Sequence, residues 1–237
     1  MPHIENKGKN MPIVARACFL DFDHTLFHTD EFFHVDVRNA FLHLGIGDDV
    51  WRRAYDAVWH NGYTLEKHAA EISRRTGGRI PLEEMNVVLK DAFSDLRKYV
   101  FPDVVPFLEM AKERGFSTHL LSFGDEAWQK YKVKSSGLWP YFNEVFFTGR
   151  EGMKAGVVFE RSPDGAEIHI IDNNPDELDV IKDRVPQCRT WRINRVPDEH
   201  KHPSDESSRL LFLEARRYTG KTGRYPHSPC TSLIGIL

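Results

Sequence analysis

The sequence has few cysteines, no large excess of charge and no long apolar run. Its three cysteines, Cys18, Cys188 and Cys230, are widely spaced and odd in number. This predicts reduced thiols and argues against a disulfide framework or a zinc site. The formal net charge is −3, and the 32 lysines and arginines are scattered, so we expect no nucleic-acid partner. These properties favour a cytoplasmic protein.

No apolar run approaches the roughly 20 residues of a transmembrane helix, and residues 1–10 lack the apolar core of a signal peptide. We therefore expect no membrane partner, and the oligomeric state stays open. The 237 residues, 41% of them hydrophobic, suffice for one α/β core with a smaller insert. Residues 1–12 are expected to form a disordered lead-in.

Strand patterns alternate with helix patterns in much of the chain. We expect strands at 13–22, 116–121, 143–148, 167–171 and, as the last, 189–193. One helix is expected to be capped by Asp103 and ended by Gly115, and another to run from Gly124-Asp125 to about Ser136. This alternation predicts a doubly wound, mostly parallel, Rossmann-like α/β sheet with helices on both faces.

A long segment without convincing strands interrupts this pattern. Within residues 29–98, apolar residues recur at helical spacing in four stretches that glycine-containing turns separate. We predict an α/β core of residues 1–27 and 100–237 with an inserted helical cap of residues 28–99. The tail, residues 197–237, is rich in proline, serine and histidine. It has one expected helix near 209–218 and suggests no function.

Acids and a hydroxyl follow three of the predicted strands. Asp21 and Asp23 follow the first strand, and Ser122 and Asp172 follow two later ones. Ligands of an open parallel sheet bind outside the carboxyl ends of its strands, so these groups should converge. Lys154 lies in a glycine-flanked stretch expected to be a loop, and Lys130 and Lys132 are its substitutes.

These positions resemble the four motifs of the haloacid dehalogenase-like hydrolase superfamily, with a helical cap inserted after the first motif. The matching stretches are Asp21-Phe22-Asp23-His24-Thr25-Leu26, Leu120-Leu121-Ser122, Lys154, and Ile171-Asp172-Asn173-Asn174-Pro175-Asp176. Their order and spacing agree from residue 13 to about residue 195. The sequence departs at His24, where glycine is commoner, and at Asn173, where many members carry a second acid.

The resemblance implies a role for each motif residue. Asp21 would attack phosphorus, and Asp23 would protonate the leaving group and then activate water. Mg²⁺ would bind Asp21, Asp172 and the backbone carbonyl of Asp23. Phosphate would contact Thr25, Ser122 and Lys154.

Other candidates surround these motif residues. Asp176 is a candidate to support the metal ligands. For Glu177, a structural role as the capping-box partner of Asn174 is favoured over a catalytic role. The cap would close over the site and select the substrate, with Phe32 and Phe33 as candidate selecting residues.

General chemistry supports the same roles. A cluster of carboxylates around a phosphate ester needs a cation, and hard oxygen ligands suit Mg²⁺. Phosphoryl transfer depends on positioning and charge neutralisation, to which Lys154 contributes one charge. Two carboxylates two residues apart on a turn can face different sides of a substrate. One can then attack while the other transfers a proton.

The expected function is Mg²⁺-dependent hydrolysis of a small phosphorylated metabolite. A phosphomutase of the same family and a catalytically idle binding member remain alternatives. A dehalogenase is disfavoured because it needs neither a metal nor an acid at position 23. An ATPase-type member is disfavoured because Asp23 is not threonine. A receiver domain would be shorter and lack the cap.

Overall fold

The computed structural model describes residues 15–59, 62–150, 152–201 and 204–237. Its centre is a six-stranded sheet in the order β3-β2-β1-β4-β5-β6, in which every neighbouring pair is parallel. The strands are β1 (Arg16–Leu20), β2 (Ser117–Phe123), β3 (Glu144–Thr148), β4 (Glu167–Asp172), β5 (Arg189–Ile193) and β6 (Ser228–Cys230). This is a Rossmann-like α/β fold, as the alternating pattern predicts.

Side chains alternate between the two faces of the sheet, and each face buries its own apolar cluster. On β1, Cys18 and Leu20 pack on the face covered by α5 (Val104–Glu113) and α6 (Glu126–Ser135). Ala17 and Phe19 pack on the face covered by α7 (Lys154–Arg161) and α8 (Pro175–Arg184). Because both faces are buried, the strands read as nearly continuous apolar runs.

The five predicted strands are confirmed, with small shifts at their ends. Residues 1–14, including the predicted lead-in and the first two residues of the first predicted strand, lie outside the described residues. The prediction that 189–193 is the last strand is wrong, because β6 pairs with β5. Asp103 precedes α5 but its side chain makes no cap hydrogen bond. Its carboxylate accepts from Arg195, Ser232 and Leu233 instead.

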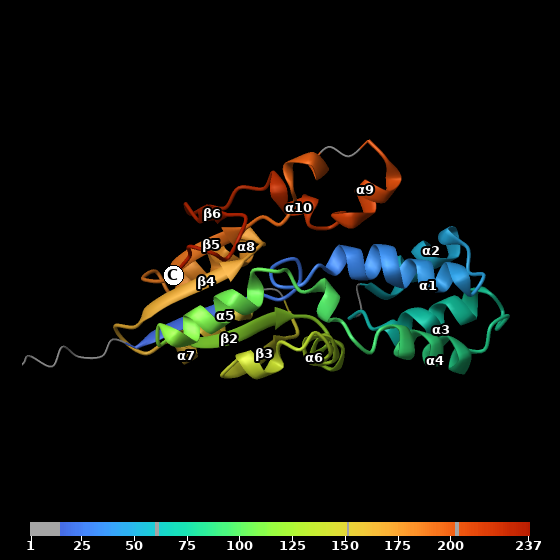
Figure 1. The fold of residues 1–237 in the computed structure, drawn as a ribbon, viewed down its shortest axis with the longest axis horizontal. Helices are drawn as coiled ribbons and strands as arrows, with labels where there is room; N and C mark the ends of the chain where they lie inside the picture. Colours follow the sequence, from blue (N-terminus) through green and yellow to red (C-terminus); the bar gives the residue numbers. More distant parts are fainter. Residues whose placement is uncertain (1–14, 60–61, 151, 202–203) are drawn as a thin grey trace, which may run out of the picture.

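The segment between β1 and β2 is helical, as predicted. A π-helical stretch η1 (Glu31–Val37) continues into α1 (Arg38–His43), followed by α2 (Asp48–Trp59), α3 (Leu65–Arg75), α4 (Leu82–Ala92) and the short turn η2 (Arg97–Tyr99). Helices α1 to α4 lie together beyond one end of the sheet (Figure 1). We call residues 28–99 the cap, and the exact division into core and cap stays a prediction.

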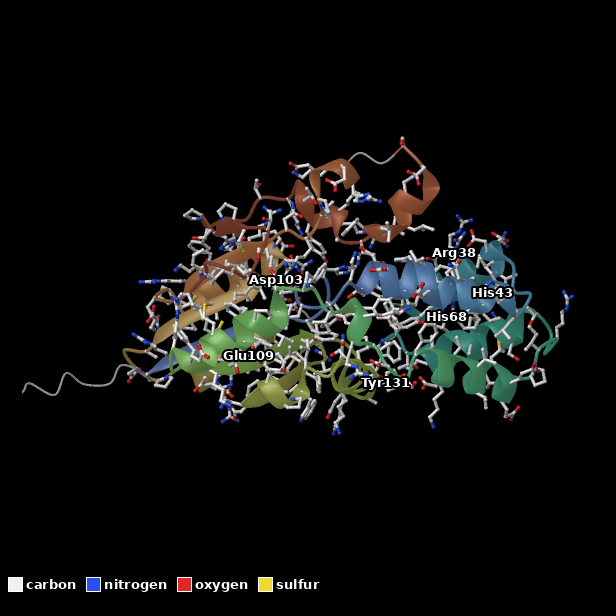
Figure 2. The ribbon with its side chains drawn as sticks, viewed as in Figure 1. Arg38, His43, His68, Asp103, Glu109 and Tyr131 are labelled. Atoms are coloured by element: carbon white, nitrogen blue, oxygen red, sulfur yellow. The ribbon has the colours of Figure 1, made fainter. Side chains whose placement is uncertain are left out.

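A buried histidine connects two cap helices. The ring of His68 on α3 contacts the Trp51 carbonyl of α2 through Nε2 (2.9 Å) and the Tyr63 hydroxyl through Nδ1 (3.2 Å). Figure 2 shows His68 inside the helical cluster. Burial lowers the pKa of His68 to about 4, so the ring is neutral at pH 7. Its two nitrogens form the contacts that hold α3 against α2 and Tyr63.

The C-terminal segment is fixed to the rest of the molecule by three buried carboxylates. It contains the short turn η4 (Asp198–His200), α9 (Glu206–Leu211), α10 (Arg216–Thr219) and β6, whereas the short turn η3 (Trp139–Tyr141) lies between α6 and β3. Its backbone N–H groups donate to Asp30 of the cap, Asp103 and Asp179. The prediction of one helix near 209–218 is wrong, because this stretch contains parts of two short helices, α9 and α10. Both lie beside the sheet and the cap (Figure 1).

The three cysteines are free, as their spacing predicts. In the described part of the chain, no helix is both long enough and apolar enough to cross a bilayer.

Candidate active site

The first motif is a compact turn at the carboxyl end of β1. The Phe22 carbonyl accepts hydrogen bonds from three successive N–H groups, those of Thr25, Leu26 and Phe27. The Asp21 N–H donates to the Ile171 carbonyl of β4 (2.9 Å), which fixes the turn beside the fourth motif. The turn therefore holds Asp21 and Asp23 at the sheet edge where the sequence places the site.

Asp21, Asp172 and Lys154 form one buried cluster. Lys154 Nζ lies 2.7 Å from Asp21 Oδ1 and 2.7 Å from Asp172 Oδ2. Burial raises the pKa of Asp21 to about 6 and raises that of Asp172, against the opposing Lys154 ammonium. The prediction that Lys154 lies in a loop is wrong, because Lys154 is the first residue of α7. Of the two flanking glycines, Gly152 (φ +76°) forms the turn before the helix, whereas Gly156 is part of the helix.

The predicted phosphate site contains two hydroxyl groups, of which Thr25 contacts this cluster and Ser122 lies near the carboxyl end of β2. Thr25 is fully buried and its Oγ1 donates to Asp21 Oδ2 (2.9 Å), so in this structure it orients the carboxylate. Ser122 is 1% exposed, and its Oγ has no hydrogen-bond partner among the described residues. An unpartnered buried hydroxyl is costly, but Ser122 is not among the described residues that line the cavity reported below, so its contact with phosphate stays a prediction.

Asp23 has its own set of partners. Its Oδ1 accepts from Lys132 Nζ (2.5 Å) and Thr29 Oγ1 (2.7 Å), and its Oδ2 accepts from Gln129 Nε2 (2.9 Å). Burial acts to raise the pKa of Asp23, but the Lys132 ammonium and these hydrogen bonds together lower it. Asp23 is therefore ionised in this structure, and it pairs with Lys132 whereas Asp21 and Asp172 share Lys154.

Sequence reasoning missed Gln129 and considered Lys132 only as a substitute for Lys154. The signal was present, because the two residues are three apart on α6, the first helix after Ser122. Residues three apart share a helix face, and this face of α6 meets Asp23.

The structure assigns other contacts to the fourth-motif residues Asn174, Asp176 and Glu177 than the sequence predicts. Asn174 caps α8, and its side chain accepts from the Asp176 N–H (3.1 Å). Asp176 is exposed and pairs with Lys221 of the tail, so it does not support metal ligands here. Glu177 lines the cavity, and its Oε1 accepts from the Gly152 N–H (2.9 Å). A capping box would require the Glu177 side chain to accept from the Asn174 N–H. That N–H donates to Asp172 Oδ1 instead (2.8 Å), so the predicted capping box is wrong.

These groups open into a cavity of about 770 Å³ between the sheet edge, the cap and the tail. Asp21, Asp23, Lys154 and Asp172 line one part of it, and the predicted selecting residues Phe32 and Phe33 line another. Glu214 and Tyr218 of the tail also line the cavity. No pattern in the tail identified them, because their place depends on contacts far away in the sequence.

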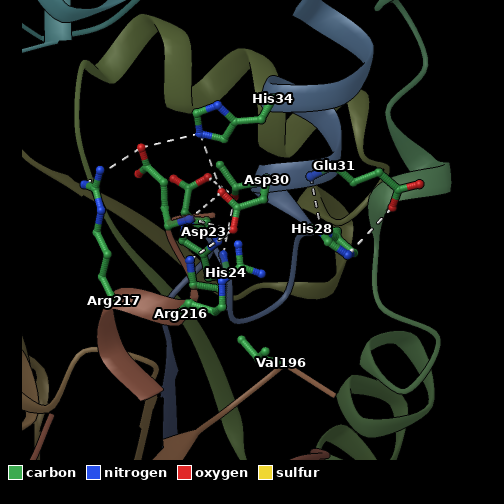
Figure 3. A network of polar contacts seen from close by, with 12 residues as sticks. Asp23, His24, His28, Asp30, Glu31, His34, Val196, Arg216 and Arg217 are labelled. Atoms are coloured by element: carbon green, nitrogen blue, oxygen red, sulfur yellow. Dashed lines mark hydrogen bonds and ion pairs between the residues drawn. The ribbon is translucent and has the colours of Figure 1, made fainter. Parts of the chain in front are cut away.

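The cavity also holds a polar network that links the first motif with the cap and the tail. His24 Nδ1 and His34 Nε2 lie 3.5 and 3.7 Å from the Asp30 carboxylate, and His34 Nε2 lies 3.5 Å from Glu214. Figure 3 shows His24, Asp30 and His34 facing one another, with Arg216 and Arg217 of the tail close by. The first motif, the cap and the tail therefore meet at one wall.

The charges at the sheet edge fit a divalent cation. Asp21 and Asp172 share the single ammonium of Lys154, which leaves one buried negative charge uncompensated. Carboxylate and carbonyl oxygens are the ligands of Mg²⁺. No three His, Cys, Asp or Glu side chains in the described ranges lie in a metal-binding group. A cation here therefore also needs backbone carbonyl or non-protein oxygens.

Comparison with known proteins places this fold. No protein-family model and no curated protein sequence matches the chain, whereas solved structures do. A haloacid dehalogenase-like hydrolase from Burkholderia xenovorans is 19% identical, with 92% of this chain and 94% of that one covered and a TM-score of 0.66. The L-2-haloacid dehalogenase of Xanthobacter autotrophicus is 16% identical, with coverages of 92% and 95% and a TM-score of 0.61.

A third similar structure, a HAD hydrolase of Bacillus subtilis bound to magnesium, is 17% identical, with coverages of 82% and 91% and a TM-score of 0.50. At these identities, likeness in structure establishes the fold. Together with the sheet order, these structures show that the chain has the fold of haloacid dehalogenase-like hydrolases.

Proposed function

We propose that this protein hydrolyses a small phosphomonoester through a phosphoaspartate on Asp21, with bound Mg²⁺. The observation that carries the proposal is the second carboxylate, Asp23, which lines the same cavity as Asp21 and has its own lysine. Expelling an alcohol requires a proton and hydrolysing a phosphoaspartate requires a base. Displacing a halide requires no proton, so a dehalogenase would have no use for Asp23.

The nucleophile is held in place by two hydrogen bonds. Thr25 Oγ1 and Lys154 Nζ each bind one oxygen of Asp21, which fixes the plane of the carboxylate. Such positioning is the main contribution a protein makes to phosphoryl transfer. In this proposal, Ser122 and Lys154 hold the phosphoryl oxygens while Asp21 attacks phosphorus and the ester oxygen leaves.

The acid–base group changes protonation between the two steps. Asp23 is ionised in this structure, and a phosphoryl dianion arriving beside it raises its pKa and favours the protonated acid. After that proton passes to the leaving alcohol, Lys132 stabilises the carboxylate, which then takes a proton from water. Asp21, Asp172 and the Asp23 backbone carbonyl would hold Mg²⁺, whose chemistry is to neutralise charge on the phosphoryl oxygens.

Turnover of p-nitrophenyl phosphate tests the proposal. We expect hydrolysis with Mg²⁺, loss of activity with EDTA, and loss in a folded Asp21→Asn variant. Asp176→Asn is the matched control, since Asp176 is exposed and paired with Lys221, and it should keep activity. Turnover of a 2-haloacid without turnover of phosphate esters would contradict the proposal and favour a dehalogenase.

A further inference from the structure

The cavity is strongly anionic. Eight carboxylate side chains line it, and among the described lining residues the only lysines or arginines are Lys132 and Lys154. Both ammonium groups are already paired, Lys132 with Asp23 and Lys154 with Asp21 and Asp172. Even with a divalent cation bound, negative charge remains in excess. Among the described lining residues, the part of a substrate beyond its phosphoryl group therefore meets no lysine or arginine that would pair with a second anionic group.

One carboxylate lies away from the predicted catalytic residues. Glu214 comes from the tail, and its Oε1 accepts from the Tyr55 hydroxyl (2.9 Å) and lies 3.5 Å from His34 Nε2. Burial acts to raise the pKa of Glu214, but His34, His24 and Tyr55 hold it at about 2. Arg217 approaches only to 4.0 Å, with a largely exposed side chain, so it screens this charge weakly.

The position of Glu214 is fixed by the backbone. Its N–H and that of Ala215 donate to the buried Asp30 carboxylate, at 3.0 Å each. Figure 3 shows Asp30 at the centre of this network. With its backbone bound to Asp30 and its carboxylate bound to Tyr55, the Glu214 side chain loses little conformational entropy when a ligand binds, which favours recognition.

Aromatic rings of the cap and of α6 form the wall next to Glu214. Tyr55 stands at their centre, with Phe33 at 4.8 Å, Trp59 at 5.3 Å and Tyr63 at 5.7 Å between ring centroids. Trp128 of α6 extends the wall beside Tyr63 (5.9 Å). All five rings line the cavity. Aromatic faces beside a carboxylate are suited to an organic cation, since ring quadrupole and carboxylate both attract positive charge.

From the anionic cavity, the fixed carboxylate and the aromatic wall, we infer that the substrate is a phosphomonoester of a small amino alcohol. Its ammonium group lies between Glu214 and the rings around Tyr55. This inference rests on the proposed phosphatase function and names the substrate class of that site. The same wall could instead stack a neutral sugar, and that is an outcome of the test below.

The experiment compares esters that differ only in charge. Phosphocholine is paired with 3,3-dimethylbutyl phosphate, and phosphoethanolamine with propyl phosphate, with glucose 6-phosphate as the sugar ester. We expect kcat/KM to favour the charged member of at least one pair by tenfold or more, and to exceed that of the sugar ester. Ratios below tenfold in both pairs, or a preference for the sugar ester, would overturn the inference.

Glu214→Gln tests the named contact. Glutamine keeps an oxygen that can accept from Tyr55, so the fold should persist while the charge is lost. We expect the charged-to-neutral ratio to fall at least tenfold in Glu214→Gln and to be unchanged in Glu109→Gln. Glu109 is exposed on α5, far from the cap (Figure 2). An unchanged ratio in a folded Glu214→Gln protein would overturn the assignment to Glu214.

A binding measurement separates the two proposals. Calorimetry on Asp21→Asn with Mg²⁺ compares phosphocholine and its neutral isostere without turnover. Tighter binding of the charged ester, in a protein whose wild type hydrolyses no phosphate ester, would support the cation site and refute the phosphatase. Hydrolysis of p-nitrophenyl phosphate without any charge preference would leave the phosphatase intact and overturn only this inference.

Discussion

At the scale of single residues, His24 stands out because its backbone is left-handed (φ +60°), which no other non-glycine residue in the described ranges adopts. This conformation costs about 1–2 kcal/mol for a residue with a Cβ, which accounts physically for the glycine common at this motif position. The imidazole lies 3.5 Å from the Asp30 carboxylate, so the side chain links the turn after β1 to the cap. Strain at such a position is typical of functional sites.

Two substitutions at His24 separate strain from contact. Both His24→Ala and His24→Gly lose the imidazole, but only glycine relieves the strained backbone. We expect His24→Gly to be more stable than His24→Ala by about 1 kcal/mol, the reverse of the usual order. Denaturant midpoints of the two variants give the answer, and an alanine variant as stable as the glycine one would show that no strain is present.

In the proposed mechanism, Asp23 is the residue whose acid–base chemistry separates hydrolysis from mere storage of a phosphoryl group. Asp23→Asn keeps the shape and the backbone carbonyl but removes the proton transfer. We expect turnover of alkyl phosphates to fall by roughly two to four powers of ten. p-Nitrophenyl phosphate should lose less in the first step and should show a burst. Equal losses for both ester types without a burst would exclude Asp23 as the acid–base group.

At the scale of elements, buried polar groups join the tail to the cap. Asp30 at the start of the cap binds two N–H groups before α10, and Tyr55 of α2 binds Glu214. A carboxylate that accepts backbone N–H groups in a buried place stabilises strongly, and its loss leaves those donors unsatisfied.

Removal of this carboxylate should release the tail locally. In Asp30→Ala we expect faster hydrogen exchange over residues 204–219 and little change in the strands, because local stability follows local contacts. The energetic cost should be about 1–3 kcal/mol. Asp198→Ala, at an almost fully exposed acid paired only with Lys201, is the control and should exchange like the wild type. Uniform protection in Asp30→Ala would mean that other contacts hold the tail.

The cap should weaken in acid because His68 is buried as a neutral ring. The unfolded chain protonates this residue below about pH 6.5, whereas the folded cap does so only near pH 4. Its stabilising effect is complete above pH 6.5 and decreases as the pH falls toward 4, by about 3 kcal/mol in all. Urea denaturation from pH 7.5 to 4.5 measures this loss. His68→Gln, which keeps a donor and an acceptor, should show a smaller pH dependence, and an equal dependence would contradict the assignment.

At the scale of the whole molecule, the sequence predicts what local patterns encode and misses what distant contacts decide. The strands that end at Asp21, Ser122 and Asp172 are strongly apolar, so their parallel pairing and the convergence of these residues are predictable. Strand β6 has three residues, one of them proline, and carries almost no local signal. Glu214 is held at the cavity by contacts with residues far away in the sequence, among them Asp30, 184 residues earlier, which binds its backbone, and Tyr55.

The central claim is that Asp21 carries the phosphoryl group during turnover, and trapping that group tests it most directly. Protein mixed with p-nitrophenyl phosphate and Mg²⁺ would be quenched in acid and reduced with borohydride, which converts an aspartyl phosphate to homoserine. Asp23→Asn should increase the amount trapped, because its base step is slow. We predict homoserine at position 21 alone in the digested protein. Active protein with no conversion at position 21, or with conversion at another acid, would contradict the account.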